Sequence, residues 1–138
     1  MKYPLRNANR WLRQAEYDWQ QAERLCREGV YSYAAFFAEQ SAQKSLKAFL
    51  FSRGRRLVAI HSVGELAREA ARIDSSLASL IDSAKRLDRH YLTSRYPDAL
   101  PEPAIPAEVY TREDAEEAVS IAQSILDSAK RVIPIDHP

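Results

Sequence analysis

The sequence predicts an all-α protein, an up-and-down bundle of about five helices. Only 3 of the 138 residues are glycine. Six of the seven prolines lie within residues 97–106 or among the last five residues. Between these breakers the apolar residues recur at intervals of three and four, which is typical of helices. Short links between successive helices favour antiparallel neighbours, so the chain is expected to run up and down the bundle.

Length and composition indicate a single domain over residues 1–138, with a helical core at about 8–133 and a tail at 134–138. The chain carries 20 Lys and Arg against 19 Asp and Glu, so no overall charge draws it toward nucleic acid or a membrane. It has neither a signal-peptide core nor an apolar run near the ~20 residues that cross a bilayer. The lone Cys26 is expected to be a small buried hydrophobe. These features favour a cytoplasmic protein without a membrane segment.

The first helix is expected over about residues 7–28, where Gly29 is a natural stop. Its packing seam is Trp11, Ala15, Asp18, Ala22 and Leu25. The second is expected over about residues 32–52, and its apolar surface suggests a central position in the bundle. One stripe of this helix is a polar band flanked by aromatics: Tyr33, Phe37, Gln40, Lys44, Lys47 and Phe51.

The third helix is expected to begin after an N-cap at Ser62, with Glu65 completing a capping box, and to end near Ile73. The fourth is expected to follow a cap at residues 74–76 and to continue to about Arg95, because Tyr96 precedes a proline.

Residues 97–110 hold four prolines and are expected to form an irregular segment. An irregular connection of this length is often functional or mobile. The fifth helix is expected to follow a cap at Thr111 with Asp114 three residues on, and to end at Pro134.

Three polar features stand out along helix one and helix two. Asp18 lies on an apolar seam, where an ionised carboxylate is costly unless it is paired. It is expected either to pair with Lys44, Lys47 or Tyr91 or to bind a ligand directly. Lys44 and Lys47, with Gln40 one turn before them, could form a small anion-binding strip. Alternatively, their side chains extend over an apolar helix or pair with buried carboxylates.

The stretch "DRHYLTSRYPD" at residues 88–98 is the densest polar cluster. Asp88, Tyr91 and Arg95 share one helical face, and Asp98 is placed to accept from Arg95 or from loop amides. One interpretation is a tethered helix end that fixes the route of the following segment. The other is a cleft in which Arg95 faces an anion and Tyr91 or Tyr96 stacks on a base.

The histidines offer little enzymatic pattern. No HxxxH, HExxH or CxxC spacing occurs, and no glycine-rich phosphate loop, so neither a metal site nor a cofactor is expected. His90 with Arg86 is the candidate catalytic pair, and His61 is the other histidine that could transfer a proton.

Four blocks together resemble the HEPN domain family (higher eukaryote and prokaryote nucleotide-binding). They are "WLRQAEYDWQQAERL", "YSYAAFFAEQSAQKSLKAFL", "HSVGEL" and "RLDRHYLTSRYPD", and the closing "DAEEAVSIAQSIL" also fits. The resemblance spans about residues 8–133 and implies a helical bundle that forms homodimers. It also implies an association with nucleotides or RNA. Many small members act with a nucleotidyltransferase, and some are RNA-cleaving toxins of toxin–antitoxin pairs.

The family's nuclease motif is an arginine, four to six residues, then a histidine. Arg56 and His61 have this spacing in the wrong block, and Arg86 and His90 are too close. A second departure is Gln43, where the family often has glutamate. The resemblance implies ligand contacts from Lys44, Lys47, Tyr91, Arg95, Tyr96 and Asp98, and a supporting polar network from Asp18, Gln40, His61 and Asp88.

The preferred function is therefore a non-catalytic nucleotide- or RNA-binding module, homodimeric, with a nucleotidyltransferase-like partner in a toxin–antitoxin-like pair. One alternative is a metal-independent endoribonuclease toxin. Another is a structural homodimeric scaffold whose polar cluster only secures the fold. The tyrosines and two tryptophans exceed what one small core must bury, which also favours a dimer.

Overall fold

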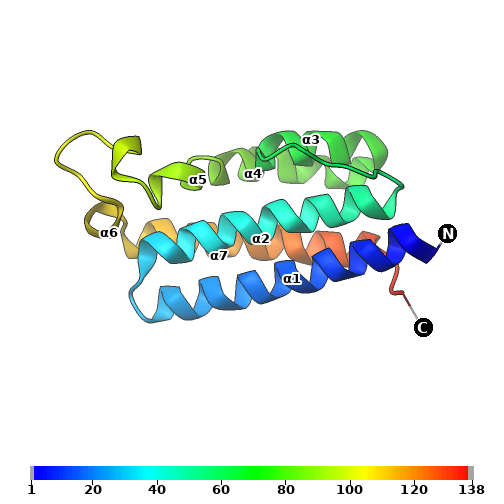
Figure 1. Cartoon of the computed structure of the whole chain (residues 1–138), viewed down its shortest axis with the longest axis horizontal. Helices are drawn as coiled ribbons and strands as arrows, with labels where there is room; N and C mark the ends of the chain where they lie inside the picture. The colour runs from blue at the N-terminus through cyan, green and yellow to red at the C-terminus, as the bar shows by residue number, and fades with distance from the viewer. Residues whose placement is uncertain (1, 137–138) are drawn as a thin grey trace.

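The computed structural model describes residues 2–136, and the side chains from Pro4 onward. The helical elements, in chain order, are α1 (Lys2–Arg27), α2 (Tyr31–Ser52), α3 (Val63–Ile73), the 3-10 turn η1 (Ser75–Leu80), α4 (Ile81–Leu87), α5 (His90–Thr93), the 3-10 turn η2 (Pro97–Ala99), α6 (Pro106–Val109) and α7 (Arg112–Val132). Figure 1 shows α1 and α2 as antiparallel neighbours, with α3 to α5 returning along α2 and α7 running back behind them. The predicted all-α, up-and-down bundle is confirmed.

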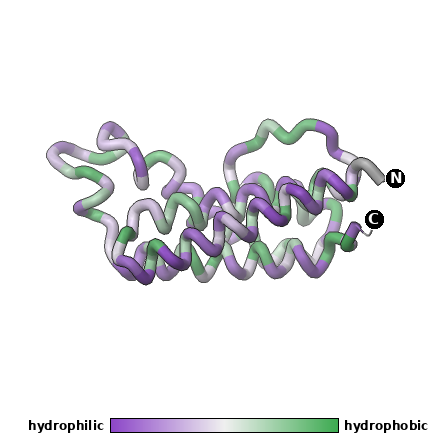
Figure 2. Tube along the Cα trace, turned by 60° about the horizontal axis from the view of Figure 1, so that its bottom comes forward, coloured by the Kyte–Doolittle hydropathy of each residue, from purple (hydrophilic) through white to green (hydrophobic). Residues whose placement is uncertain are grey.

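Helix α2 is the centre of the bundle, as its composition predicted. It contacts α1, α7 and α3, and also the short helices α4 to α6. Small buried side chains let the neighbouring backbones approach it closely, and the Ser41 hydroxyl donates to the Ala15 carbonyl of α1 at 2.7 Å. Figure 2 shows hydrophobic and hydrophilic residues alternating along the long helices. The largest fully buried apolar side chains are Phe49, Leu46, Leu50, Leu66, Leu77, Leu87, Ile125 and Val63.

The predicted helix starts at Ser62 and Thr111 are confirmed. The Ser62 hydroxyl accepts from the Glu65 amide at 3.1 Å. At Thr111 both halves of a capping box form, since Thr111 Oγ1 accepts from the Asp114 amide at 3.2 Å and Asp114 accepts from the Thr111 amide at 3.0 Å. Helix α1 begins earlier than expected, because Pro4 falls in its first turn, where no intrahelical N–H is required.

The prediction of one continuous fourth helix is wrong. The segment divides into η1, α4 and α5, with turns at Asp88 and Arg89. At this break the backbone hydrogen bonds span three residues, as in a 3-10 helix, instead of four. The Asp88 amide donates to the Lys85 carbonyl, and the Tyr91 amide donates to the Asp88 carbonyl. The carboxylate of Asp88 accepts from the backbone of α3, and this tertiary contact is invisible to local periodicity.

Candidate functional site

Arg95 lies just beyond the C-terminal end of α5, next to three aromatic rings. Its guanidinium carbon is 4.1 Å from the centre of the Phe36 ring, 4.9 Å from that of Tyr96 and 5.2 Å from that of Tyr91. Its Nε and Nη2 both donate to the Tyr91 carbonyl, at 3.1 and 2.7 Å. Among residues 2–136 no carboxylate lies within ion-pair distance of Arg95, and the exposed Asp98 makes no contact with it. We call Arg95, Phe36, Tyr91 and Tyr96 the Arg95 cluster.

The other face of this region is an exposed histidine stacked on a tyrosine. The rings of His61 and Tyr91 lie 6.3 Å apart at an interplanar angle of 12°. With Ser62 and Asp88 they line a shallow pocket of about 280 Å³. His61 Nδ1 lies 3.3 Å from Gln43 Oε1, so the histidine is joined to the central helix.

A fully buried carboxylate, Glu39, lies beneath this surface and was missed by the sequence reasoning. Its two oxygens accept from the side-chain amides of Gln40 at 2.8 Å and Gln43 at 2.9 Å. Burial is the main reason that its pKa rises to about 7, and the two amide hydrogen bonds oppose the rise. Gln43 thus links the buried Glu39 to the exposed His61. The signal that could have found Glu39 is a glutamate among alanines on the apolar surface of helix two.

The predicted pairing of Asp18 is confirmed, with Lys44 as its partner. Lys44 Nζ lies 2.6 Å from Asp18 Oδ2, and Gln14 Nε2 donates to Asp18 Oδ1 at 3.0 Å. The second lysine of the strip, Lys47, is only 6% exposed and lies 6.0 Å from the centre of the Trp11 ring. Burial lowers the pKa of Lys47, and Glu39 partly offsets that effect. The two lysines therefore face α1, whereas Arg95 contacts the N-terminal half of α2.

Asp88 secures the start of α3. Its carboxylate accepts from the Val63 amide at 2.6 Å, the Ser62 hydroxyl at 2.8 Å and the Gly64 amide at 3.2 Å. A carboxylate at this position also faces the positive end of the helix. A Cβ on Gly64 would lie 2.8 Å from Lys85 Cγ and 3.1 Å from Asp88 Oδ2, so only glycine allows this approach.

His90, the catalytic candidate, is buried in a chain of hydrogen bonds. Its Nε2 accepts from Arg89 Nε at 3.3 Å, which leaves the proton on Nδ1 to be donated to the Tyr110 hydroxyl at 2.8 Å. The Tyr110 hydroxyl then donates to Thr93 Oγ1 at 2.8 Å, and Thr93 donates to the Arg89 carbonyl. Burial is the main cause that lowers the pKa of His90 to about 4. Arg86, its proposed partner, is exposed on α4.

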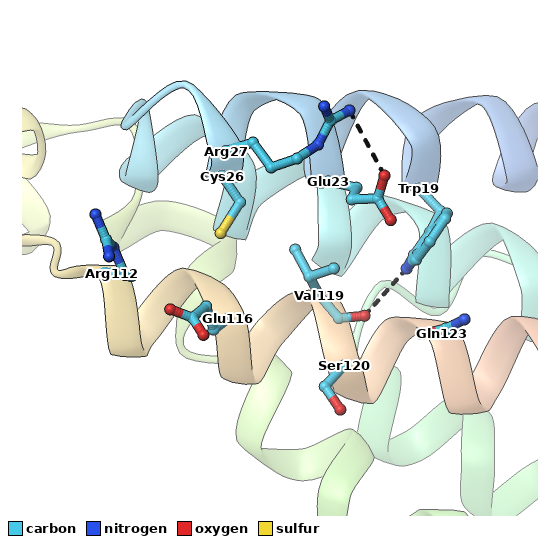
Figure 3. A pocket seen from close by; sticks show the side chains of 9 residues that line it. All are labelled: Trp19, Glu23, Cys26, Arg27, Arg112, Glu116, Val119, Ser120 and Gln123. Atoms are coloured by element: carbon cyan, nitrogen blue, oxygen red, sulfur yellow. Dashed lines mark hydrogen bonds and ion pairs between the residues drawn. The ribbon is translucent and has the colours of Figure 1, made fainter.

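A groove between α1 and α7 has balanced charges (Figure 3). Its volume is about 520 Å³. Arg27 forms an ion pair with Glu23 at 3.6 Å. The pKa of Arg112 is raised by its hydrogen bond to the Tyr31 hydroxyl and by the negative charge of Glu116. Cys26 lies in this groove and is only half-buried, not fully buried as expected. This partial burial, and secondarily the nearby Glu116, raises the pKa of its thiol.

Two absences hold for residues 2–136. No group of three or more His, Cys, Asp or Glu side chains there could hold a metal ion. None of the helices in that range has the length and hydropathy needed to cross a membrane.

Comparisons with known proteins agree with this architecture. A model of the HEPN domain family matches residues 8–132. A Methanocaldococcus jannaschii protein named "Putative toxin MJ1304" is 30% identical over 135 residues, which cover 93% of this chain and 89% of that protein.

Solved structures show the same likeness. TT1696 from Thermus thermophilus superposes with a TM-score of 0.84 at 34% identity, covering 95% of this chain and 98% of that one. ST0689, described as an archaeal HEPN homologue, has a TM-score of 0.75 at 34% identity, covering 92% and 98%. A HEPN domain protein of Thermotoga maritima has a TM-score of 0.69 at 27% identity, covering 89% and 96%.

Proposed function

Since this chain belongs to the HEPN domain family, we propose that it is a non-catalytic nucleotide- or RNA-binding module of a toxin–antitoxin-like pair. In this proposal it acts as a homodimer, together with a nucleotidyltransferase-like partner. The similarity to a protein named as a putative toxin supports the toxin–antitoxin part of the proposal. The Arg95 cluster supports the binding of a nucleotide or RNA.

The single observation that carries the proposal is a guanidinium fixed in place without a carboxylate. Arg95 uses Nε and Nη2 to bind the Tyr91 carbonyl, so two of its five N–H donors are engaged and the others are available to an anion. The rings of Phe36 and Tyr91 hold the guanidinium in one orientation. Guanidinium groups bind phosphate in a bidentate geometry, and a held guanidinium loses less entropy on binding.

Tyr96 adds a surface for a base. Its side chain is 50% exposed while its ring lies beside Arg95. A stacked base contributes about 1–3 kcal/mol without sequence preference. In the proposal Tyr91 completes the ligand contacts at the Arg95 cluster. Lys44 and Lys47, also expected as ligand contacts, face α1 instead, and Asp98 makes no hydrogen bond or ion pair with Arg95. The supporting polar network consists of Asp18, Gln40, His61 and Asp88.

Catalysis is left out of the proposal because of the state of His90. With a pKa near 4 and both ring nitrogens engaged, this histidine is a poor proton carrier near neutral pH. Its bonds to Tyr110 and Arg89 support a structural role.

The homodimer is proposed because large apolar side chains remain exposed. Tyr33 is 54% exposed and Leu92 50%. Aromatic residues are enriched at interfaces between proteins. Sedimentation at micromolar concentration should give a species of twice 15.7 kDa, and a 15.7 kDa species alone would refute the dimer.

The test of ligand binding uses labelled nucleotides and short RNA with wild type, Arg95→Gln and Arg68→Gln. Arg68 is an exposed arginine of α3 and provides a matched loss of one charge. We expect Arg95→Gln to weaken binding by roughly tenfold, the value of one charge-assisted contact, and Arg68→Gln to bind as wild type. Equal binding by wild type and Arg95→Gln would remove Arg95 from the site.

The partner is tested separately. A nucleotidyltransferase-like reading frame next to the gene for this chain is expected, and its product should co-purify with this protein when both are expressed. Two products that purify independently would sink the partner proposal and leave the ligand proposal standing.

A further inference from the structure

A second groove, lined by α1 and by Lys44 of α2, is positively charged, unlike the charge-balanced groove between α1 and α7. Its volume is about 560 Å³, and its lining residues, which we call the α1 groove, are Arg10, Trp11, Arg13, Gln14, Tyr17 and Lys44. Three of the six are cationic and none is acidic. The protein carries a formal net charge of only +1, so this is a local concentration of positive charge.

The two arginines of the α1 groove are free to bind a ligand. Arg10 and Arg13 are exposed, and neither makes a hydrogen bond or an ion pair with any residue in the range 2–136. They lie one turn apart on the same face of α1, so both can contact one anion. Lys44 contributes less, because its ammonium is bound to Asp18 at 2.6 Å.

The aromatic residues of the α1 groove have different roles. Trp11 is packed, with the Phe51 ring at 5.3 Å and Lys47 over its own ring at 6.0 Å, so it forms a wall. Tyr17 is 56% exposed and follows Arg13 by one turn, so its ring is available for stacking. Cations beside a free aromatic ring are the combination that binds the phosphate and the base of a nucleotide. The carboxylates of an acidic peptide would bind Arg10 and Arg13 but would not stack on the Tyr17 ring.

A half-exposed row on α2 leads from the α1 groove toward the Arg95 cluster. Phe36, Gln40 and Lys44 follow one another at intervals of four, and each is partly exposed. Phe36 contacts Arg95, and Lys44 lines the α1 groove. Their separation of eight positions corresponds to about 12 Å along the helix axis. A single strand of a few nucleotides could follow this row between the two positions.

We propose that the α1 groove is a second site for a nucleoside phosphate, with Arg10 and Arg13 on the phosphate and Tyr17 on the base. The ligand class rests on the proposed function, whereas the location rests on the α1 groove itself. The same chemistry is offered by a free nucleotide and by a stretch of single-stranded RNA.

The experiment measures binding of AMP and of labelled oligouridylates of about four and about twelve nucleotides, lengths within the usual range of single-strand sites. The variants are Arg10→Gln/Arg13→Gln, Tyr17→Ala and a control, Arg27→Gln/Arg112→Gln, which removes the same charge from the groove between α1 and α7. Arg10, Arg13 and Tyr17 are exposed, so circular dichroism should show unchanged folding.

We expect Arg10→Gln/Arg13→Gln to weaken binding by roughly tenfold for each arginine and the control to bind as wild type. Tyr17→Ala should weaken AMP and oligouridylate binding and leave binding of inorganic polyphosphate unchanged. AMP binding that depends on the two arginines identifies a free nucleotide as the ligand, and dependence seen only with the longer strand identifies RNA.

Four results would overturn the inference. Equal losses in the two double variants would mean that only net charge matters. Unchanged binding by Arg10→Gln/Arg13→Gln, with a loss in Arg95→Gln, would reject the α1 groove and keep the proposed function. No binding of any nucleotide by wild type would reject both. Polyglutamate that binds as tightly as the longer oligouridylate, through the same arginines, would show that the occupant is an acidic protein segment.

Discussion

The guanidinium carbon of Arg95 lies 4.1 Å from the centre of the Phe36 ring, and this contact joins the end of α5 to the central helix α2. It is a cation–π contact between the guanidinium and the ring. The same arginine binds the carbonyl of Tyr91 in α5, so it also caps the C-terminal end of that helix.

Arg95→Lys is expected to lower the free energy of unfolding by about 1–2 kcal/mol, because lysine keeps the charge but loses the paired hydrogen bonds to the Tyr91 carbonyl and part of the ring contact. Urea denaturation measures the difference. Arg95→Met, which keeps apolar contact with Phe36 and removes the charge, separates two roles. If the polar cluster only stabilises the fold, Arg95→Met should bind ligand as wild type does. If the proposed function is correct, Arg95→Met should bind ligand more weakly.

Glu39→Gln is expected to change how stability depends on pH. The pKa of Glu39 rises from 4.5 to about 7 on folding, so the folded state binds its proton more tightly. Wild-type stability should therefore fall as pH rises from 4.5 to about 7 and stay level above that, with a total loss of up to about 3 kcal/mol. Denaturation at several pH values should show that Glu39→Gln lacks this slope. The same slope in both proteins would refute an ionisable role for Glu39.

His90→Gln is expected to remove the opposite trend. Folding lowers the pKa of His90 from 6.5 to about 4, so protonation favours the unfolded state. The His90 contribution to stability is complete above pH 6.5 and is lost as pH falls toward 4, by about 3 kcal/mol. The Glu39 and His90 trends oppose each other between about pH 4.5 and 6.5, so the single variants must be compared with wild type in that window. An acid slope that persists in His90→Gln would contradict the assignment.

Gly64→Ala is expected to destabilise the protein by about 1–3 kcal/mol, the usual effect of overpacking. The added methyl would lie 2.8 Å from Lys85 Cγ and 3.1 Å from the Asp88 oxygen that accepts from the Gly64 amide. Lys85→Ala shortens the first of these neighbours, so Gly64→Ala/Lys85→Ala should recover part of the loss in thermal denaturation. Additive effects of the two substitutions would show that they do not meet.

Purified protein is expected to leave mixed RNA intact in the presence of EDTA. The buried His90 has a depressed pKa and no free ring nitrogen for a substrate. Gel electrophoresis over several hours checks the outcome. Cleavage that disappears in His61→Ala would instead assign the reaction to the exposed histidine beside Tyr91, and cleavage that disappears in His90→Ala would reverse the interpretation of the buried one.

Local signals predicted the fold well where the physics is local. Helix spacing, the caps at Ser62 and Thr111, and the glycine and proline breaks all depend on neighbours within a few residues. The break at Asp88 was not predictable in this way, because it depends on a carboxylate that binds a helix 25 residues earlier in the chain.

The candidate site was predicted in part for the same reason. Asp18 stood out as a charge on an apolar seam, and its partner Lys44 was among those expected. Glu39 did not stand out, because its two amide partners lie on its own helix and its burial depends on how the other helices surround α2. The free arginines of the α1 groove carry no sequence signal, since a lack of partners appears only in three dimensions.

The hydrogen-bond chain from His90 through Tyr110 to Thr93 has a consequence for how this architecture can vary. It fastens the far end of the proline-rich excursion, residues 97–109, to the short helix from which that excursion departs. The two ends of residues 97–109 are thus held together by these hydrogen bonds, and a change in the length of the segment is not expected to displace α7. Residues added to or removed from this segment are therefore expected to alter the surface around α6 and to leave the packing of α1, α2 and α7 unchanged.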